Sequence, residues 1–320
     1  MRAVVTGGAG FIGSNIVDGL VSAGADVLVL DDLSAGRETN LDDALAAGAR
    51  FARIDVRDAA AVTDAVTAFG PEVVFHLAAQ IDVRASMVEP ARDAATNVLG
   101  SINVFDAARA AGARRVVNTS TGGAIYGETA VIPTPETEPA RPLSAYGLSK
   151  RTAEEYGGWF RQTHGLDVVT LRYGNVYGPR QDPTGDGGVI AIFCDRVLSG
   201  RRPIVFGDGH QTRDYVFVGD IVAANLAVAA APAPRYDRYN VGTGTEVSVL
   251  ELVSALAAVA GVDPVTFAPE FWPRRAGELR RSCLDVTRVR TDLDLAEPTP
   301  LAEGLHQTLN WARKITPARP

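Results

Sequence analysis

Cysteine is scarce in this chain of 320 residues, which contains only Cys194 and Cys283. The two cysteines are far apart and lack the close spacing of metal ligands, so the sequence predicts neither a disulfide framework nor a metal site. Two reduced thiols are typical of a protein in a reducing compartment. We therefore expect a cytoplasmic location.

Long apolar runs and an excess of positive charge are also missing. No segment approaches the roughly 20 apolar residues of a membrane-spanning helix, and Gly7 interrupts the first apolar run too early for a secretory signal. We expect no membrane partner. The formal net charge is −7, which disfavours nucleic-acid binding, because such binding depends largely on neutralising phosphates. A few local arginines can still bind the phosphates of a small ligand.

The first half of the chain alternates short apolar runs with helical patterns. This alternation predicts an α/β fold, namely a Rossmann-type, doubly wound parallel sheet with helices on both faces. We assign residues 1–172 to this domain. Strands are predicted at 3–5, 27–30, 51–54, 73–77, 115–118 and 168–171, and helices near 59–69, 86–111 and 145–163.

The order loosens after about residue 173, where glycine and proline cluster at 178–188, 200–209 and 231–234. A helix is predicted at 249–260. Residues 267–275 include Pro269 and Pro273 and are predicted to form a loop. We expect 173–320 to form a smaller lobe, interleaved with late elements of the sheet.

A glycine motif follows the first predicted strand directly. Gly7, Gly10 and Gly13 form a Gly-x-x-Gly-x-x-Gly pattern that opens the first helix. Glycines allow a tight turn and a close approach to a pyrophosphate, while the N–H groups of the helix N-terminus attract its charge. An ordinary glycine turn is the alternative, but the strand–turn–helix context favours a dinucleotide site.

Carboxylates at the ends of the next strands indicate which dinucleotide is bound. Asp31 ends the second predicted strand, where it accepts hydrogen bonds from ribose hydroxyls and repels a 2′-phosphate, and Asp32 adds to the repulsion. These residues favour NAD, whereas Arg37 leaves NADP open. Asp55 and Val56 follow the third strand and are expected at the adenine edge. A turn or helix cap is the alternative for Asp55.

Tyr146 and Lys150 are the candidate catalytic pair. At i and i+4 they share one face of a helix, and an ammonium beside a phenol lowers the phenol's pKa, which suits it as a general base for a sugar hydroxyl. A strand end rich in hydroxyls, residues 119–121, comes before them. It is expected to hold the reacting oxygen, although it could be only a polar turn.

Together these motifs resemble the extended short-chain dehydrogenase/reductase family, and within it the bacterial UDP-glucose 4-epimerases. The similarity covers nearly the whole chain and includes residues 76–80, 175–181, 206–209, 213–218, 239–244 and 275–278. It implies an NAD-dependent isomerase that interconverts UDP-glucose and UDP-galactose through a 4-keto intermediate and transient NADH. Residues 173–320 would then bind the nucleotide sugar. Ser282 is small at a position that leaves room for a 2-acetamido group, which implies activity on UDP-N-acetylglucosamine as well.

The resemblance also implies roles for individual residues. Thr121 is our first choice for the catalytic hydroxyl and Ser120 the second, because the family's usual position falls on Gly122. The implied catalytic residues are Tyr146, Lys150 and Thr121. The implied cofactor contacts are Gly7, Gly10, Phe11, Ile12, Gly13, Asp31, Asp32, Asp55, Val56, Leu77, Ala78, Ala79, Gln80, Asn97, Tyr146, Lys150 and Tyr173. The implied substrate contacts are Ser120, Thr121, Asn175, Gly188, Val189, Val205, Phe206, Arg213, Arg275 and Glu278.

Other interpretations remain. A sugar 4,6-dehydratase normally needs an Asp-Glu pair after the catalytic threonine, where this chain has Gly122 and Gly123. UDP-glucuronate 4-epimerase is harder to exclude, because Arg172, Arg180 or Arg213 could meet a carboxylate. A silent NAD-binding regulator is disfavoured by the presence of both Tyr146 and Lys150. The helices near 97–111 and 145–163 are candidates for a homodimer interface, although their apolar residues could also be buried within the monomer.

Overall fold

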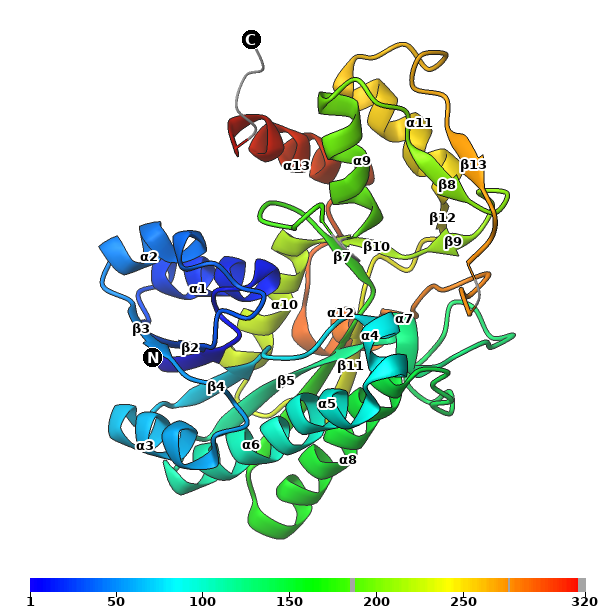
Figure 1. Cartoon of the computed structure of the whole chain (residues 1–320). Coiled ribbons are helices and arrows are strands. Elements are labelled where there is room, and N and C mark those ends of the chain that lie inside the picture. Colours follow the sequence, from blue (N-terminus) through cyan, green and yellow to red (C-terminus); the bar gives the residue numbers. More distant parts are fainter. Residues whose placement is uncertain (185–187, 276, 316–320) are drawn as a thin grey trace.

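A seven-stranded, all-parallel sheet forms the centre of the computed structural model, which describes residues 1–184, 188–275 and 277–315 (Figure 1). The strand order is β11-β6-β5-β4-β1-β2-β3, the doubly wound order in which β1 and β4 flank the point of reversal. The predicted fold class is confirmed. The strands are β1 (Arg2–Thr6), β2 (Asp26–Asp31), β3 (Arg50–Arg53), β4 (Val73–His76), β5 (Arg115–Thr121), β6 (Asp167–Tyr173) and β11 (Arg238–Val241).

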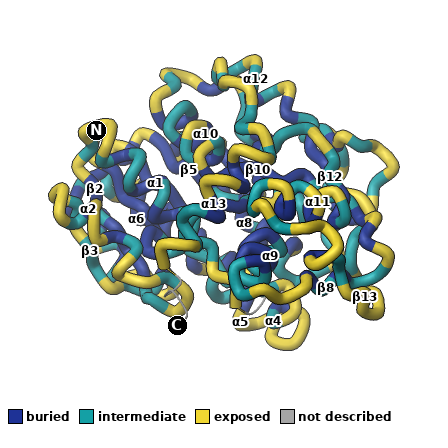
Figure 2. Tube along the Cα trace, turned by 90° about the horizontal axis from the view of Figure 1, so that it is seen from above, coloured by how far each residue is buried: buried dark blue, intermediate teal, exposed yellow. Residues whose placement is uncertain are grey.

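Helices cover both faces of this sheet, which explains why its strands are apolar without alternation. In β1, Ala3 and Val5 pack into the core on one face and Val4 into the core on the other. The first face is covered by α1 (Phe11–Ser22), α2 (Asp42–Ala46), α10 (Val218–Ala230) and α12 (Thr287–Leu293). The second is covered by α3 (Ala59–Phe69), α6 (Gly100–Ala110) and α8 (Ala145–His164). The buried strands form the dark centre of this domain in Figure 2.

The prediction of one continuous helix near residues 86–111 is wrong. It consists of α4 (Val83–Val88), α5 (Pro90–Ala94), the π-helical turn η2 (Ala95–Leu99) and α6. The break comes at Pro90, which has no N–H to donate and keeps Glu89 out of the helical conformation, with φ −124° and ψ 63°. The apolar periodicity continues across the break and hides it in the sequence. Shorter elements nearby are η1 (Glu38–Leu41) and α7 (Gly122–Ile125).

A smaller lobe with its own hydrophobic core lies above the carboxyl edge of the sheet (Figure 1). Its helices are α9 (Val189–Leu198), α11 (Val249–Ala260) and α13 (Leu301–Ile315). Three small two-stranded sheets connect them: β7 (Asn175–Tyr177) with β10 (Tyr215–Phe217), β9 (Thr212–Arg213) with β12 (Val247–Ser248), and β8 (Ile204–Phe206) with β13 (Glu270–Trp272). The loop predicted at 267–275 is therefore wrong in part. β13 forms because it pairs with β8, which is distant in sequence.

The chain passes between the two parts more than once. β11 completes the sheet beside β6, and α10 packs on α1, although both elements come after residue 173. Among the described residues no helix has the length and apolar character needed to cross a membrane.

Candidate active site

The glycine loop between β1 and α1 has no room for side chains. A Cβ at Gly13 would lie 2.1 Å from the carbonyl oxygen of Gly7, and one at Gly7 would lie 2.5 Å from the backbone nitrogen of Ala78. Gly7 also has a positive φ of 69°. Helix α1 begins at Phe11 and Ile12 after Gly10, with no side-chain cap and no acidic residue in its first turn. Its N–H groups are thus free to face an anion.

Asp31, at the end of β2, is buried beside this loop. Its carboxylate accepts hydrogen bonds from the backbone N–H of Ala9 (2.9 Å) and of Leu33 (2.8 Å). Burial raises the pKa of Asp31, and the two N–H bonds act against that rise. Asp31 therefore holds the glycine loop in shape, and its predicted contact with a ribose stays a prediction. Asp32 accepts hydrogen bonds from the backbone and hydroxyl of Ser34.

Two residues near the adenosine position have local partners. Arg37 forms an ion pair with Asp182 at 2.9 Å, so its charge is partly balanced. Asp55 caps its own turn, because its carboxylate accepts from the backbone and the guanidinium of Arg57, which holds its pKa below the ordinary value. This cap was the alternative for Asp55. Val56 is buried in the core below.

The turn after β4 is held by Asn97, in the π-helical turn. The Asn97 amide accepts from the backbone N–H of Gln80 and donates to its carbonyl, both at 2.9 Å. π-Helical turns recur at functional sites. Leu77, Ala78 and Ala79 form the edge of this turn facing Gly7, and the side chain of Gln80 turns back to donate to the carbonyl of Asp82.

Tyr146 and Lys150 share one face of α8, whose N-terminus is capped by Ser144. Thr121 is the last residue of β5, and its hydroxyl, which accepts from the backbone N–H of Ala124 at 3.2 Å, is close enough to the Tyr146 phenol to lower the phenol's pKa. The side chain of Ser120 alternates to the other face of the strand, where its hydroxyl is buried without a hydrogen-bond partner in the described part of the chain. Of the two candidate hydroxyls, Thr121 is the one that meets the tyrosine.

The expectation that Lys150 makes Tyr146 acidic is not met by the chain itself. Burial raises the pKa of Tyr146 to about 12, and the charge of Asp93 raises it further, while Thr121 lowers it. Burial lowers the pKa of the Lys150 ammonium to about 8, against the charges of Glu154 and Asp93. Lys150 is only 2% exposed. The shift at the phenol is therefore set by burial, Asp93 and Thr121, without a contribution from Lys150.

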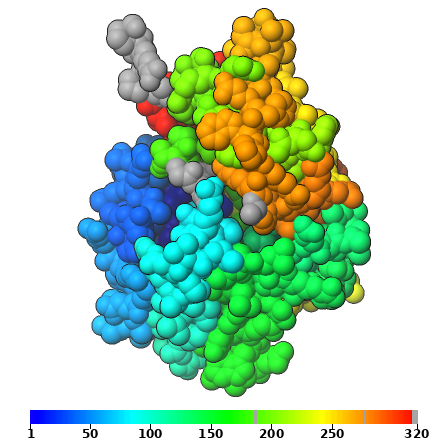
Figure 3. Space-filling view, turned by 45° about the vertical axis from the view of Figure 1, so that its right-hand side comes forward, coloured from blue at the N-terminus to red at the C-terminus, as the bar shows by residue number. Residues whose placement is uncertain are grey.

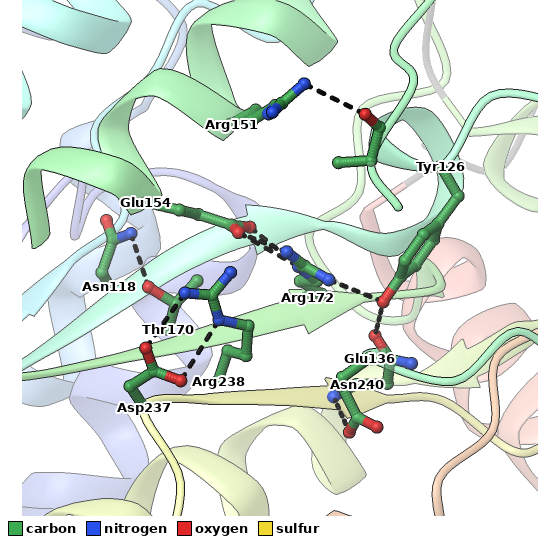
Figure 4. A network of polar contacts seen from close by, with 11 residues as sticks. Asn118, Tyr126, Glu136, Arg151, Glu154, Thr170, Arg172, Asp237, Arg238 and Asn240 are labelled. Carbon is green, nitrogen blue, oxygen red and sulfur yellow. Dashed lines mark hydrogen bonds and ion pairs between the residues drawn. The ribbon is translucent and has the colours of Figure 1, made fainter. Parts of the chain in front are cut away.

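A buried ion pair links this helix to the rest of the fold (Figure 4). Arg172 in β6 donates to Glu154 in α8, the closest contact being 2.6 Å, and to the hydroxyl of Tyr126 at 2.8 Å. Tyr126 in turn donates to Asn240 of β11 at 2.7 Å. Because Glu154 is one turn from Lys150, this network fixes the register of α8 against the sheet.

Tyr173, at the end of β6, lies beside the end of β5. It is the register partner of Thr121. Its hydroxyl accepts from the amide of Asn225 at 2.7 Å and contacts the hydroxyl of Thr119 at 3.3 Å. Burial raises the pKa of Tyr173 to about 12, so this phenol stays neutral.

The lobe supplies the residues predicted to meet a nucleotide diphosphate. Arg213 of β9 pairs with Glu278 at 3.3 Å, and the guanidinium of Arg275 lies 3.7 Å from the ring centroid of Phe206. Val205 is buried beneath Phe206. Ala276, within the same motif, lies outside the described residues. The space-filling view shows the lobe in orange facing residues 80–100 in cyan, with a recess between them (Figure 3).

Three more predicted contacts lie at the entrance to the lobe. Gly188 is the N-cap of α9 and has no side-chain cap, and Val189 begins this helix. Asn175 is exposed at the start of β7, and a Cβ on Gly123 would lie 3.5 Å from its side-chain oxygen. Asn175 therefore lies close to the Thr121 turn.

The arginines considered as partners for a sugar carboxylate all have partners of their own. Arg172 is enclosed in the network with Glu154, Arg180 pairs with Asp18 of α1 at 2.7 Å, and Arg213 pairs with Glu278. Arg172, being 3% exposed in its side chain, is out of reach of any ligand.

Sequence reasoning missed two buried titratable groups next to the catalytic pair. His76, at the end of β4, contacts the hydroxyls of Thr6 (2.7 Å) and Ser101 (3.0 Å), and burial together with Lys150 lowers its pKa to about 3. It is therefore neutral. Asp93 in α5 is fully buried. A single aspartate in a short helix looks like a surface residue, and only its spacing of four from Asn97 gave a signal.

Comparisons with known proteins agree with this geometry. The family described as "NAD dependent epimerase/dehydratase family" matches residues 3–242. A UDP-glucose 4-epimerase of Mycolicibacterium smegmatis is 47% identical over 98% of this chain and 99% of that protein. The crystal structure of a Thermotoga maritima UDP-glucose 4-epimerase with UDP-glucose matches with a TM-score of 0.93 and 43% identity, over 98% of this chain and 99% of the other. That of a Thermus thermophilus UDP-glucose 4-epimerase in complex with NAD matches with a TM-score of 0.89 and 41% identity, over 99% and 100%.

Proposed function

The chain belongs to the NAD-dependent epimerase/dehydratase family, and we propose that it is a UDP-glucose 4-epimerase, which interconverts UDP-glucose and UDP-galactose. The observation that supports this most directly is that α8, which carries Tyr146 and Lys150 on one face, packs on β5, whose last residue is Thr121, with the glycine loop at the same edge of the sheet. This arrangement places a candidate base for a sugar hydroxyl next to a dinucleotide site.

The site fits NAD. The glycine loop would admit the pyrophosphate to the uncapped N-terminus of α1, and the acidic Asp31 and Asp32 at the end of β2 would favour a ribose without a 2′-phosphate. When bound, NAD supplies the redox chemistry by accepting a hydride from the sugar C4 and returning it. The ammonium of Lys150, on α8 one turn after Tyr146, would donate to the nicotinamide ribose.

Tyr146 is the proposed general base and acid. In this proposal its phenol takes the proton of the 4-hydroxyl and returns it to the same C4 oxygen after the 4-keto sugar has turned its other face toward the site, while Thr121 orients the reacting oxygen. A phenol whose pKa is about 12 needs positive charge nearby to act near neutral pH. Lys150 and the oxidised ring would supply that charge.

The nucleotide would be anchored by the lobe while the sugar turns over. Arg213 and Arg275 offer guanidinium groups to the diphosphate, and Glu278, already paired with Arg213, would accept from the ribose hydroxyls. Phe206, Val205, Gly188 and Val189 would frame the base. Because these groups hold the UDP and not the hexose, the sugar ring can present either face to Tyr146.

The two enzymatic alternatives are less well supported. A 4,6-dehydratase needs a pair of carboxyl groups at the turn after Thr121, where this chain has Gly122 and Gly123; a Cβ on Gly122 would also lie 2.5 Å from the side chain of Leu284, so a larger residue there would require the leucine to move. A glucuronate epimerase needs a cation for the carboxylate, and the three arginines considered for it are paired.

Product analysis tests the proposal. Purified protein incubated separately with UDP-glucose, UDP-N-acetylglucosamine and UDP-glucuronate, followed by NMR, should give UDP-galactose from the first. Tyr146→Phe should lower kcat by roughly 100-fold or more, because it removes the proton-transfer group. A dehydrated product, or a Tyr146→Phe variant with full activity, would contradict the assignment. No turnover with bound NAD would favour the silent regulator.

We also propose that the protein is a homodimer that pairs through α8. Its outer face exposes Leu148, Tyr156 and Trp159, which together with Arg151, Thr152 and Glu155 line an open groove. An apolar stripe along one face of a helix indicates a binding surface. Sedimentation should give a dimer that Trp159→Glu converts to a monomer. A wild-type monomer at micromolar concentration would rule the proposal out.

The cellular location also remains a proposal. Cys194 and Cys283 are both free and buried in the structure, and free thiols suit a reducing compartment. We infer a cytoplasmic enzyme.

A further inference from the structure

Asp93 is a buried carboxylate that the proposed reaction does not use. It lies in α5 and has no solvent exposure. Its Oδ1 atom accepts hydrogen bonds from Nε2 of Gln80 (3.1 Å) and Nδ2 of Asn97 (3.0 Å). Its Oδ2 atom is also buried and has no hydrogen-bond partner within residues 1–184, 188–275 and 277–315. Burying such a carboxylate is costly unless a cation lies close by.

The cation that Asp93 acts upon is Lys150. Helix α5 packs directly on α8, which carries Tyr146 and Lys150. The negative charge of Asp93 raises the pKa of both side chains. Its hydrogen-bond partners, in contrast, are the neutral amides of Gln80 and Asn97, which leave its charge uncompensated.

Glu154 is the second carboxylate near Lys150, and of the two it has the larger effect on the pKa of the ammonium. However, Glu154 is bound by Arg172 through contacts of 2.6, 3.0 and 3.2 Å, and both side chains are buried. Glu154 thus has a cation in direct contact, whereas the hydrogen-bond partners of Asp93 are neutral amides. Asp93 is therefore the carboxylate near Lys150 that is not already engaged by another cation at its hydrogen-bonding atoms.

The other ionisable groups around Asp93 leave this pairing intact. On its outer side Asp82, Glu89 and Arg92 line a cavity with it, and Glu89 and Arg92 form an ion pair at 3.2 Å. Arg84, on α4, is exposed. On the inner side His76 is neutral, because its pKa lies near 3, and α8, which packs on α5, carries Tyr146 and Lys150, whose pKa values Asp93 raises.

We propose that Asp93 is a positioning residue, the counter-charge that keeps Lys150 protonated and in place when the positively charged nicotinamide ring binds beside it. The inference rests on the proposed function, in which Lys150 assists Tyr146. A second cation entering the site would favour loss of the lysine proton, and without that proton the lysine could no longer assist Tyr146.

The composition of the chain allows a direct test, because Lys150 and Lys314 are its only lysines. Protein labelled with ¹³C at lysine Cε gives two NMR signals, and Lys314, exposed near the end of α13, serves as internal reference. In full-length protein saturated with NAD⁺ but without sugar, Lys150 should stay charged at pH 7. A neutral Lys150 at that pH in the wild type overturns the proposal without recourse to any variant.

Asp93→Asn isolates the charge, because an amide oxygen can still accept from Gln80 and Asn97. The titration midpoint of Lys150 should fall by about one pH unit or more, while that of Lys314 should not move. The alkaline limb of kcat should shift to lower pH by a similar amount. An unchanged Lys150 midpoint, or a loss of kcat that is equal at every pH, overturns the proposal.

Glu89→Gln is the matched control, since it removes an exposed acid that lines the same cavity four residues earlier. It should leave the Lys150 midpoint where it is, and an equal shift in this variant would remove any specific role for Asp93. Because the lysine titration uses no sugar, it reports on Asp93 even if the protein does not epimerise UDP-glucose.

Discussion

The buried pair of Glu154 and Arg172 offers the most quantitative prediction for this fold. Their side chains are 2% and 3% exposed, and Arg172 also donates to Tyr126. Glu154→Gln would remove the negative charge while keeping the shape of the side chain. The guanidinium would then stay buried with a neutral amide in place of its counter-ion.

The expected cost follows from this geometry. Removing one partner of a buried ion pair typically destabilises a protein by about 3–5 kcal/mol. The glutamine oxygen can still accept one hydrogen bond, and Arg172 keeps its bond to Tyr126, so we expect a value near the lower end, about 3 kcal/mol. Glu154→Leu combined with Arg172→Met removes both charges. Tyr126 keeps its bond to Asn240, so this double variant should lose only about 1 kcal/mol.

Urea unfolding at fixed protein concentration would measure both values. Glu155→Gln is the matched control, because Glu155 is the next residue on α8 and is exposed; its effect should stay within about 0.5 kcal/mol. The reasoning fails if Glu154→Gln costs less than about 1 kcal/mol, or if the double variant is less stable than the single one. Either result would mean that Arg172 does not depend on Glu154 as its buried counter-ion.

Three further predictions concern the cofactor loop, the sugar pocket and acid stability. Gly13→Ala should abolish copurification of NAD, because the added Cβ would lie 2.1 Å from the Gly7 oxygen. The control Gly158→Ala has open space around the added Cβ and should retain the cofactor. NAD bound at the wild-type level in Gly13→Ala would refute the assignment of the glycine loop to the dinucleotide. Ser282→Tyr should lower turnover of UDP-N-acetylglucosamine relative to UDP-glucose, and an unchanged ratio would show that this residue does not limit the pocket. His76, with its pKa lowered to about 3, stays neutral in the folded protein, but in the unfolded chain it takes up a proton below about pH 6.5. Its contribution to the free energy of unfolding is therefore fully present above that pH. That contribution is lost as the pH falls toward 3, by about 1.4 kcal/mol per pH unit. His76→Gln should give a shallower acid slope in unfolding experiments, and equal slopes would contradict the assignment.

The Tyr146 and Lys150 pair illustrates where sequence reasoning succeeds and where it stops. The spacing of four residues puts both side chains on one face of α8 whatever surrounds them, and the helix begins at Ala145, where it was expected. The direction of the pKa shift at Tyr146 did not follow from that spacing. It depends on how deeply the phenol is buried and on Asp93 from another helix.

The break at Pro90 makes the same point about the fold. The apolar periodicity over 86–111 is real, but a periodic pattern does not show that a helix is continuous. Pro90 signals the interruption in the sequence, and the structure shows its use: the interruption brings Asp93 and Asn97 inward beside Gln80. β13 was missed for another reason, since its partner β8 lies far away in the chain.

The sequence by itself determined six of the seven strands of the central sheet, all but β11, together with the glycine loop and the placement of Tyr146 and Lys150 on one helix face, because each depends on a repeat or spacing within a few residues. Only the tertiary structure decided which charges are compensated. Arg172 contacts Glu154 across 18 residues and Tyr126 across 46, and Tyr126 reaches Asn240 across 114. Burial removes these groups from water and makes their free energies depend on distant partners, which no local pattern encodes.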